Sequence, residues 1–230
     1  MVRGLVEKMR IQISKNILVA VIIIICLILI QTIMYESARF LCGEPTLLTS
    51  RIDEHTPFLT VFIYPYISWY PMLFLIPLII YIAQPKNLYS YAMTNIIVVV
   101  FAFIIFIAFP TTVNRPEVNV TDFTSFVTYL IFYTNTPPTC CLPSTHCALC
   151  FMFILYTINI KELKPGIRAL IAIWSLVIVI STLYIKQHVI YDILGALILV
   201  LVSHIICKRF KLYKITEKAH NRLLKLLSKD

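Results

Sequence analysis

The chain has 230 residues, of which 60% are hydrophobic and 13% are charged, and its net charge is +9. Its mean hydropathy of +0.87 exceeds what a soluble domain of this size carries, so the composition excludes a soluble protein and indicates an integral membrane protein. The positive charge calls for no nucleic acid, because basic residues also orient membrane proteins and attract anionic lipid headgroups.

Six apolar segments are each close to the ~20 residues with which an α-helix crosses a bilayer. They are residues 16–34, 58–83, 91–109, 143–160, 168–185 and 189–207. We therefore expect an all-α, polytopic membrane protein in which residues 1–230 form a single domain, a bundle of six transmembrane helices. The second segment contains Pro65, Pro71 and Pro77, so it should be bent or locally unwound.

Two of the connecting segments are expected to lie at the membrane interface. Residues 35–57 are rich in charge and long enough to cover the mouth of the bundle as an interfacial helix. Residues 122–133 are apolar with interleaved threonines, which predicts a short interfacial or re-entrant helix.

Lysine and arginine are distributed unevenly between the two sides of the predicted bundle. With six spans both termini lie on one side, and that side holds 16 of the 20 basic residues. The other four are Arg39, Arg51, Arg115 and Lys186. The positive-inside rule therefore predicts that both termini are cytoplasmic, with residues 1–15 and 208–230 as basic ends that attract anionic headgroups.

Ionisable side chains occur beside two of the apolar segments. Burying such groups near a membrane is energetically unfavourable, so their presence indicates a function. His146 opens the fourth span, His188 opens the sixth, and Arg115 lies between the third and the fourth. The predicted topology brings all three to the extracytoplasmic end of the bundle, at one depth of one leaflet. Such convergence is typical of a site that a lipid headgroup reaches.

The spacing of these groups fits phosphoryl transfer. His188 and Asp192 are four residues apart and so share a helix face. Asp192 can fix the imidazole tautomer and make the other ring nitrogen a better nucleophile. His146 would protonate the leaving oxygen and then activate water or an acceptor hydroxyl.

A second set of groups would hold the phosphate oxygens. Ser144 and the first amides of the fourth helix offer hydrogen bonds, and Arg115 and, by its position, Lys186 offer charge. The alternatives are that Ser144 only caps its helix and that the two basic side chains only snorkel to the interface.

These residues resemble the signatures of the type 2 phosphatidic acid phosphatase superfamily, which read Lys-x6-Arg-Pro, Pro-Ser-x-His and Ser-Arg-x5-His-x3-Asp. In the same order, the chain has Arg115-Pro116, Pro143-Ser144-Thr145-His146, and Ser181-Thr182 with His188 and Asp192. The resemblance implies a six-helix enzyme that cleaves or transfers phosphate on lipids, with His188 as nucleophile, Asp192 as its partner and His146 as acid.

The same resemblance implies that Arg115, Ser144 and Ser181 bind phosphate. Two cations of the superfamily pattern are missing, because the corresponding positions hold Ala108 and Thr182. Lys186 could place an ammonium near the same oxygens, although lysine cannot reproduce the bidentate grip of arginine. A site with fewer cations would suit a less charged headgroup such as a phosphodiester, which the superfamily's lipid phosphotransferases use.

The predicted function is that of a lipid phosphatase in the plasma membrane. It would remove phosphate from an outer-leaflet lipid phosphate or diphosphate through a phosphohistidine at His188, with no metal or other cofactor. Two alternatives remain, namely a lipid phosphotransferase of the kind that makes phosphosphingolipids, and a membrane protein that binds lipids without chemistry.

Cysteines raise the further question of a metal site or a disulfide. Four cysteines and His146 fall within residues 140–150, but a second Cys or His pair at zinc-finger spacing is missing. Cys42 and either Cys140 or Cys141 would lie on the outer side and could form a disulfide.

Overall fold

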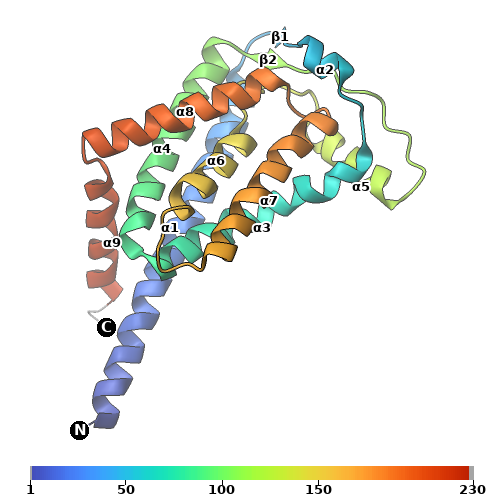
Figure 1. The fold of residues 1–230 in the computed structure, drawn as a ribbon. Coiled ribbons are helices and arrows are strands. Elements are labelled where there is room, and N and C mark those ends of the chain that lie inside the picture. Colours follow the sequence, from blue (N-terminus) through green and yellow to red (C-terminus); the bar gives the residue numbers. More distant parts are fainter. Residues whose placement is uncertain (1, 228–230) are drawn as a thin grey trace.

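The structure is a computed structural model that describes residues 2–227 and is mainly helical (Figure 1). The helices are α1 (Val2–Leu41), α2 (Arg51–His55), α3 (Ile63–Ala83), α4 (Pro85–Ala108), α5 (Phe123–Thr134), α6 (Thr145–Thr157), α7 (Pro165–Tyr184), α8 (Ile190–Arg209) and α9 (Tyr213–Leu227). A 3₁₀ turn, η1 (Thr60–Phe62), precedes α3, and two short strands, β1 (Thr46–Leu47) and β2 (Thr111–Thr112), pair in parallel.

Five stretches of helix in the described part of the chain are long and apolar enough to cross a membrane. They are Ile13–Leu41, Thr60–Ala83, Pro85–Ala108, Pro165–Tyr184 and Ile190–Arg209. Large apolar side chains such as Ile173 of α7 and Ile198 of α8 are exposed, as expected for helices that face lipid. The prediction of an all-α, polytopic membrane protein is confirmed.

The predicted fourth span, residues 143–160, contains α6, which has only 13 residues. At 1.5 Å per residue, a helix of this length covers about 20 Å, less than the ~30 Å of a bilayer core. Instead, α6 packs against α4, α7 and α8, and side chains such as Met152 and Phe153 are fully buried. Because protein surrounds it, α6 does not need the length of a lipid-facing span.

The proline-rich second segment forms helix throughout α3. The helix runs unbroken through Pro71 and Pro77, and it is preceded by the 3₁₀ turn η1 and by two residues, Phe58 and Leu59, that are not helical. The expected local unwinding is therefore not found within α3.

Short elements gather at one end of the bundle, where β1, β2 and α2 lie near the start of α8 (Figure 1). The strand pair joins the segment after α1 to the segment after α4. Residues 35–57 were expected to form an interfacial helix, but α1 continues to Leu41 and α2 has only five residues. The helix expected at residues 122–133 is present as α5, capped by Asp122.

The basic C-terminal end contains a helix that the sequence analysis did not predict. α9 packs against α4 and α1, with the Thr216 hydroxyl donating to the Tyr89 carbonyl at 2.7 Å. Burial of His220 near Tyr81 and Tyr89 lowers its pKa. Of the two predicted basic ends, Met1 and residues 228–230 lie outside the described residues.

Candidate active site

His188 and Asp192 form the predicted pair, but not on a shared helix face, because His188 lies in the turn before α8 and only Asp192 is in the helix. The Nδ1 atom of His188 lies 3.0 Å from Asp192 Oδ2, and the carboxylate is fully buried. The same oxygen accepts from the Val189 N–H at 3.1 Å, because Asp192 occupies the N3 position of α8 and reaches back to the helix start. With Nδ1–H donating to the carboxylate, Nε2 of His188 keeps its lone pair.

The turn that carries His188 is held from both sides. The backbone N–H groups of Gln187 and His188 both donate to the Thr182 carbonyl, at 3.0 and 3.2 Å. Lys186 adopts a positive φ of 52° in this turn, and its ammonium donates to the Asp53 carbonyl at 2.6 Å and to the Thr56 carbonyl. The Lys186 ammonium was predicted to contact phosphate, and in the structure it donates to backbone carbonyls in and next to α2.

His146 lies in the first turn of α6, next to two aromatic rings of α3. Its ring is stacked on Trp69 with centroids 3.8 Å apart and on Tyr66 at 4.6 Å. The ring centroids of His146 and His188 are 6.3 Å apart, and Nε2 of His146 is buried without a hydrogen-bond partner. The fold therefore brings together two histidines that are 42 positions apart in the sequence.

The two predicted serine ligands are fully buried and engaged within the protein. Ser144 caps α6, since its Oγ accepts from the Cys147 N–H at 3.2 Å, and its own N–H donates to the Asp192 carbonyl at 3.1 Å. The Ser181 hydroxyl donates to the Ile178 carbonyl at 2.6 Å. Neither serine lines the cavities described below.

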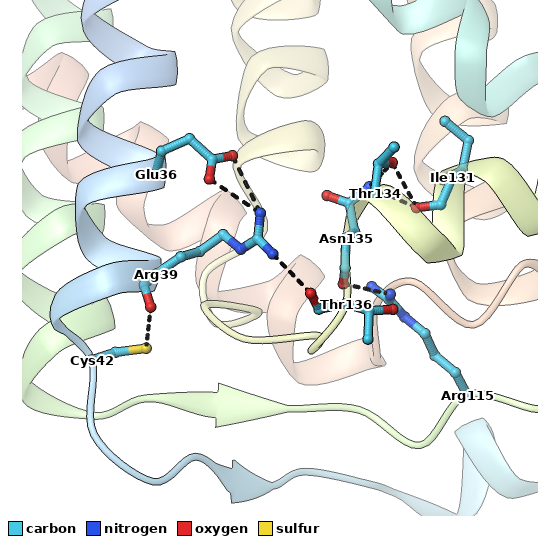
Figure 2. A network of polar contacts seen from close by, with 8 residues as sticks. All are labelled: Glu36, Arg39, Cys42, Arg115, Ile131, Thr134, Asn135 and Thr136. Carbon is cyan, nitrogen blue, oxygen red and sulfur yellow. Dashed lines mark hydrogen bonds and ion pairs between the residues drawn. The ribbon is translucent and has the colours of Figure 1, made fainter.

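Arg115 is held at the centre of the site. Its Nη1 donates to the Asn135 carbonyl at 2.9 Å and its Nη2 to Gln187 Oε1 at 2.6 Å, while Nε has no partner. Figure 2 shows Arg115 and Arg39 reaching the carbonyls of the consecutive residues Asn135 and Thr136. Burial lowers the pKa of Arg115, although a guanidinium stays protonated at neutral pH.

Two cavities meet at Arg115 and His188. The first, of about 170 Å³, also reaches His146, Gln187 and the aromatic rings of α3. The second, of about 290 Å³, lies toward α2 and is lined by polar groups including Asp53, Glu54 and Lys186. A phosphoryl group at His188 would therefore lie beside both cavities.

A family model described as the PAP2 superfamily matches residues 31–206, a range that includes the histidine pair, Asp192 and Arg115. The chain belongs to the PAP2 superfamily. This membership supports a phosphatase-like activity on lipid phosphates. Neither a curated protein nor a solved structure matches the chain.

At two of the positions where the PAP2 signatures have cations, this chain has side chains without charge. Thr182 is fully buried, and its hydroxyl donates to the Val179 carbonyl at 2.7 Å. Ala108 ends α4. Arg115 is the only lysine or arginine that lines the first cavity in the described structure.

The sequence analysis missed several residues of this PAP2 site. Gln187 contacts Arg115, Asn135 supplies a carbonyl to it, and Trp69 and Tyr66 cover the His146 ring. The only signal for Gln187 was its place next to His188. The two aromatic residues resembled ordinary apolar residues of a span.

The seven cysteines are free thiols. Burial raises the pKa of the Cys140 thiol to about 12, and the neighbouring Cys42 thiol contributes to the shift. A disulfide between Cys42 and either Cys140 or Cys141 stays a prediction. Within the described residues, His, Cys, Asp and Glu side chains form no group of three or more that could hold a metal ion.

Proposed function

We propose that this PAP2 superfamily member is an integral-membrane lipid phosphatase that hydrolyses a lipid phosphate or diphosphate through a phosphohistidine at His188. The observation that carries the proposal is the 3.0 Å contact between His188 and buried Asp192, on a cavity shared with His146 and Arg115. A nucleophile, the group that orients it, an acid and a cation are the parts that phosphoryl transfer needs.

In the first step Nε2 of His188 attacks phosphorus. A P–N bond forms as the P–O bond to the lipid breaks, and the leaving oxygen takes a proton from His146. The positive charge that develops on the imidazole is stabilised by Asp192, while Arg115 neutralises charge on the phosphoryl oxygens.

In the second step water attacks the phosphohistidine. Neutral His146 accepts a proton from the water, the P–N bond breaks, and inorganic phosphate leaves with the oxygen of that water. His188 and His146 return to their starting protonation states. Phosphohistidine chemistry of this kind needs no metal, so EDTA should leave the activity intact.

Phosphate oxygens would also meet the N-terminus of α6, where Ser144 is the cap. Direct contacts from the Ser144, Ser181 and Lys186 side chains are retained as part of the proposal. Only the Ser181 hydroxyl would have to leave its present acceptor, the Ile178 carbonyl. The Ser144 hydroxyl can donate while its Oγ accepts from the Cys147 N–H, and the Lys186 ammonium has a third N–H besides the two that bond carbonyls.

We further propose that α6 is a sixth crossing and that both termini are cytoplasmic, which places the site on the outer face of the plasma membrane. The 16 basic residues on the terminal side support this orientation. The basic residues predicted for the outer side lie at the same end of the bundle as the site, which also supports this orientation. Arg39 donates to the Thr136 carbonyl, and Lys186 donates to a carbonyl of α2, the helix that begins with Arg51.

A second candidate, a lipid phosphotransferase, is favoured by the pair of cavities. The second cavity, of about 290 Å³, could hold a headgroup that stays on phosphorus while an acceptor alcohol replaces water near His146. A single guanidinium at the first cavity also suits the single charge of a phosphodiester.

The test is phosphate release by purified protein in detergent micelles with EDTA. Phosphatidate, a polyprenyl diphosphate and phosphatidylglycerol phosphate would be compared for wild type, His188→Ala and the control His55→Ala, an exposed histidine at the end of α2. We expect release from at least one substrate by wild type and the control, and none by His188→Ala.

Undiminished release by His188→Ala would contradict the phosphohistidine. If wild type releases nothing, diacylglycerol or ceramide is added as acceptor with a phosphodiester donor. Headgroup transfer would then identify the phosphotransferase. Lipid binding without either reaction, and without phosphate labelling of His188, would identify a non-catalytic lipid-binding protein.

A further inference from the structure

Gln187 is the residue between the brace of the turn, Lys186, and the nucleophile, His188. Its side chain is only 4% exposed and lines the first cavity. The amide oxygen accepts from Arg115 Nη2 at 2.6 Å, but the amide nitrogen is buried with no hydrogen-bond partner. A buried polar group without a partner is uncommon in native proteins and needs an explanation.

The bond to Arg115 decides which way this amide faces. A guanidinium only donates, so the oxygen of Gln187 must point toward it and the NH₂ group must point away. The flipped amide would place donors against donors. Arg115 therefore holds the two N–H donors of Gln187 in a fixed direction.

The unpaired nitrogen is one of four around the same cavity. Gln187 Nε2, Arg115 Nε, Trp69 Nε1 and His146 Nε2 are all buried without partners, and all four residues line the cavity together with His188. The N–H groups of Gln187, Arg115 and Trp69 are donors whatever the tautomer of His146. Fixed donors gathered beside a nucleophile are the arrangement that stabilises an oxyanion, because they need no reorganisation when the charge arrives.

We propose that Gln187 is a phosphate-binding residue of this site and the positioning residue for Arg115. Its oxygen holds the guanidinium, and its Nε2–H donates to a phosphoryl oxygen of the substrate. The inference rests on the proposed phosphoryl transfer at His188. It explains how a site with few cations keeps enough donors, since a carboxamide adds a hydrogen bond without adding charge.

The experiment compares Gln187→Glu and Gln187→Met with the control Gln84→Met. In Gln187→Glu an oxygen still accepts from Arg115, but the N–H donor is lost and a negative charge faces the phosphate. Gln187→Met keeps the approximate length and loses both hydrogen bonds. Gln84 lies at the start of α4 and bonds only Asn87 among the described contacts of its side chain.

The probe is inorganic orthovanadate, a mimic of the pentacoordinate phosphoryl transition state. We expect both Gln187 variants to bind it at least about tenfold more weakly than wild type, as is typical when a hydrogen bond to a charged group is lost. Without vanadate, Gln187→Glu should melt within about 2 °C of wild type, because the contact with Arg115 remains. Gln84→Met should bind like wild type.

Turnover gives an independent readout. A carboxamide does not titrate, so the loss of kcat/KM in Gln187→Met should be the same at every pH between about 6 and 8. Vanadate binding by both variants within about twofold of wild type would overturn the role of Gln187 alone. If wild type neither binds vanadate nor releases phosphate, the proposed function fails, and this inference fails with it.

Discussion

The two oxygens of the Asp192 carboxylate differ in their hydrogen bonds. Its Oδ2 accepts from both His188 and the Val189 N–H, whereas its Oδ1 is buried with no partner. A buried carboxylate compensated by so few donors attracts positive charge. In the proposed mechanism the neighbouring imidazole becomes positive when its other nitrogen bonds to phosphorus, and this carboxylate would stabilise that charge.

Asp192→Asn tests this role at the residue itself. The amide oxygen could still accept from Nδ1–H and from the Val189 N–H, but the side chain would no longer carry the negative charge that stabilises the imidazolium formed when Nε2 bonds to phosphorus. We expect the rate of phosphohistidine formation to fall about a thousandfold, as is typical when the orienting carboxylate of a histidine is neutralised. Quenched-flow labelling with ³²P-labelled substrate measures the rate.

A matched control for this substitution is Asp122→Asn, at the exposed cap of α5. Hydrogen bonds from Ser125 lower the pKa of Asp122, and asparagine caps a helix about as well as aspartate does. The control should label at the wild-type rate. Equal labelling rates in Asp192→Asn and wild type would show that the carboxylate does not act on His188.

At the scale of elements, α2 acts as a brace for the turn between α7 and α8. Asp53 of α2 accepts from the Ile190 N–H through Oδ1 at 3.0 Å, and its backbone carbonyl accepts from Lys186. A five-residue helix contributes little stability alone. Its contacts instead fix the segment on which His188 stands, which a catalytic geometry requires.

Lys186→Met separates this bracing role from the predicted phosphate contact. Loss of the bonds to two carbonyls should cost about 1 to 2 kcal/mol and lower Tm. If bracing is the main role, orthovanadate affinity should fall less than about threefold. Calorimetry with and without orthovanadate measures both quantities. A tenfold weaker affinity at unchanged Tm would instead identify Lys186 as a phosphate ligand.

For the whole molecule, the sequence predicts best where one physical signal dominates. Apolar length located the five long helices, although it also predicted a span at residues 143–160, where α6 has only 13 residues. The four-residue spacing of His188 and Asp192 already implied their contact. α9 was missed because its alternation of basic and apolar residues was taken for an orientation signal alone. The pairing of Thr46 with Thr111, and the stacking of Trp69 on His146, depend on long-range packing that periodicity does not encode.

The orientation of the bundle can be tested with two glycines that tolerate a side chain. Gly43, after α1, and Gly166, in the first turn of α7, have no atom within 4 Å of an added Cβ. If both termini are cytoplasmic, Gly43→Cys should react with a membrane-impermeant maleimide in intact cells, above the background of the native cysteines. Gly166→Cys should react only after permeabilisation. The reverse pattern would move the site to the cytoplasmic face, and equal labelling of both in intact cells would exclude a single orientation.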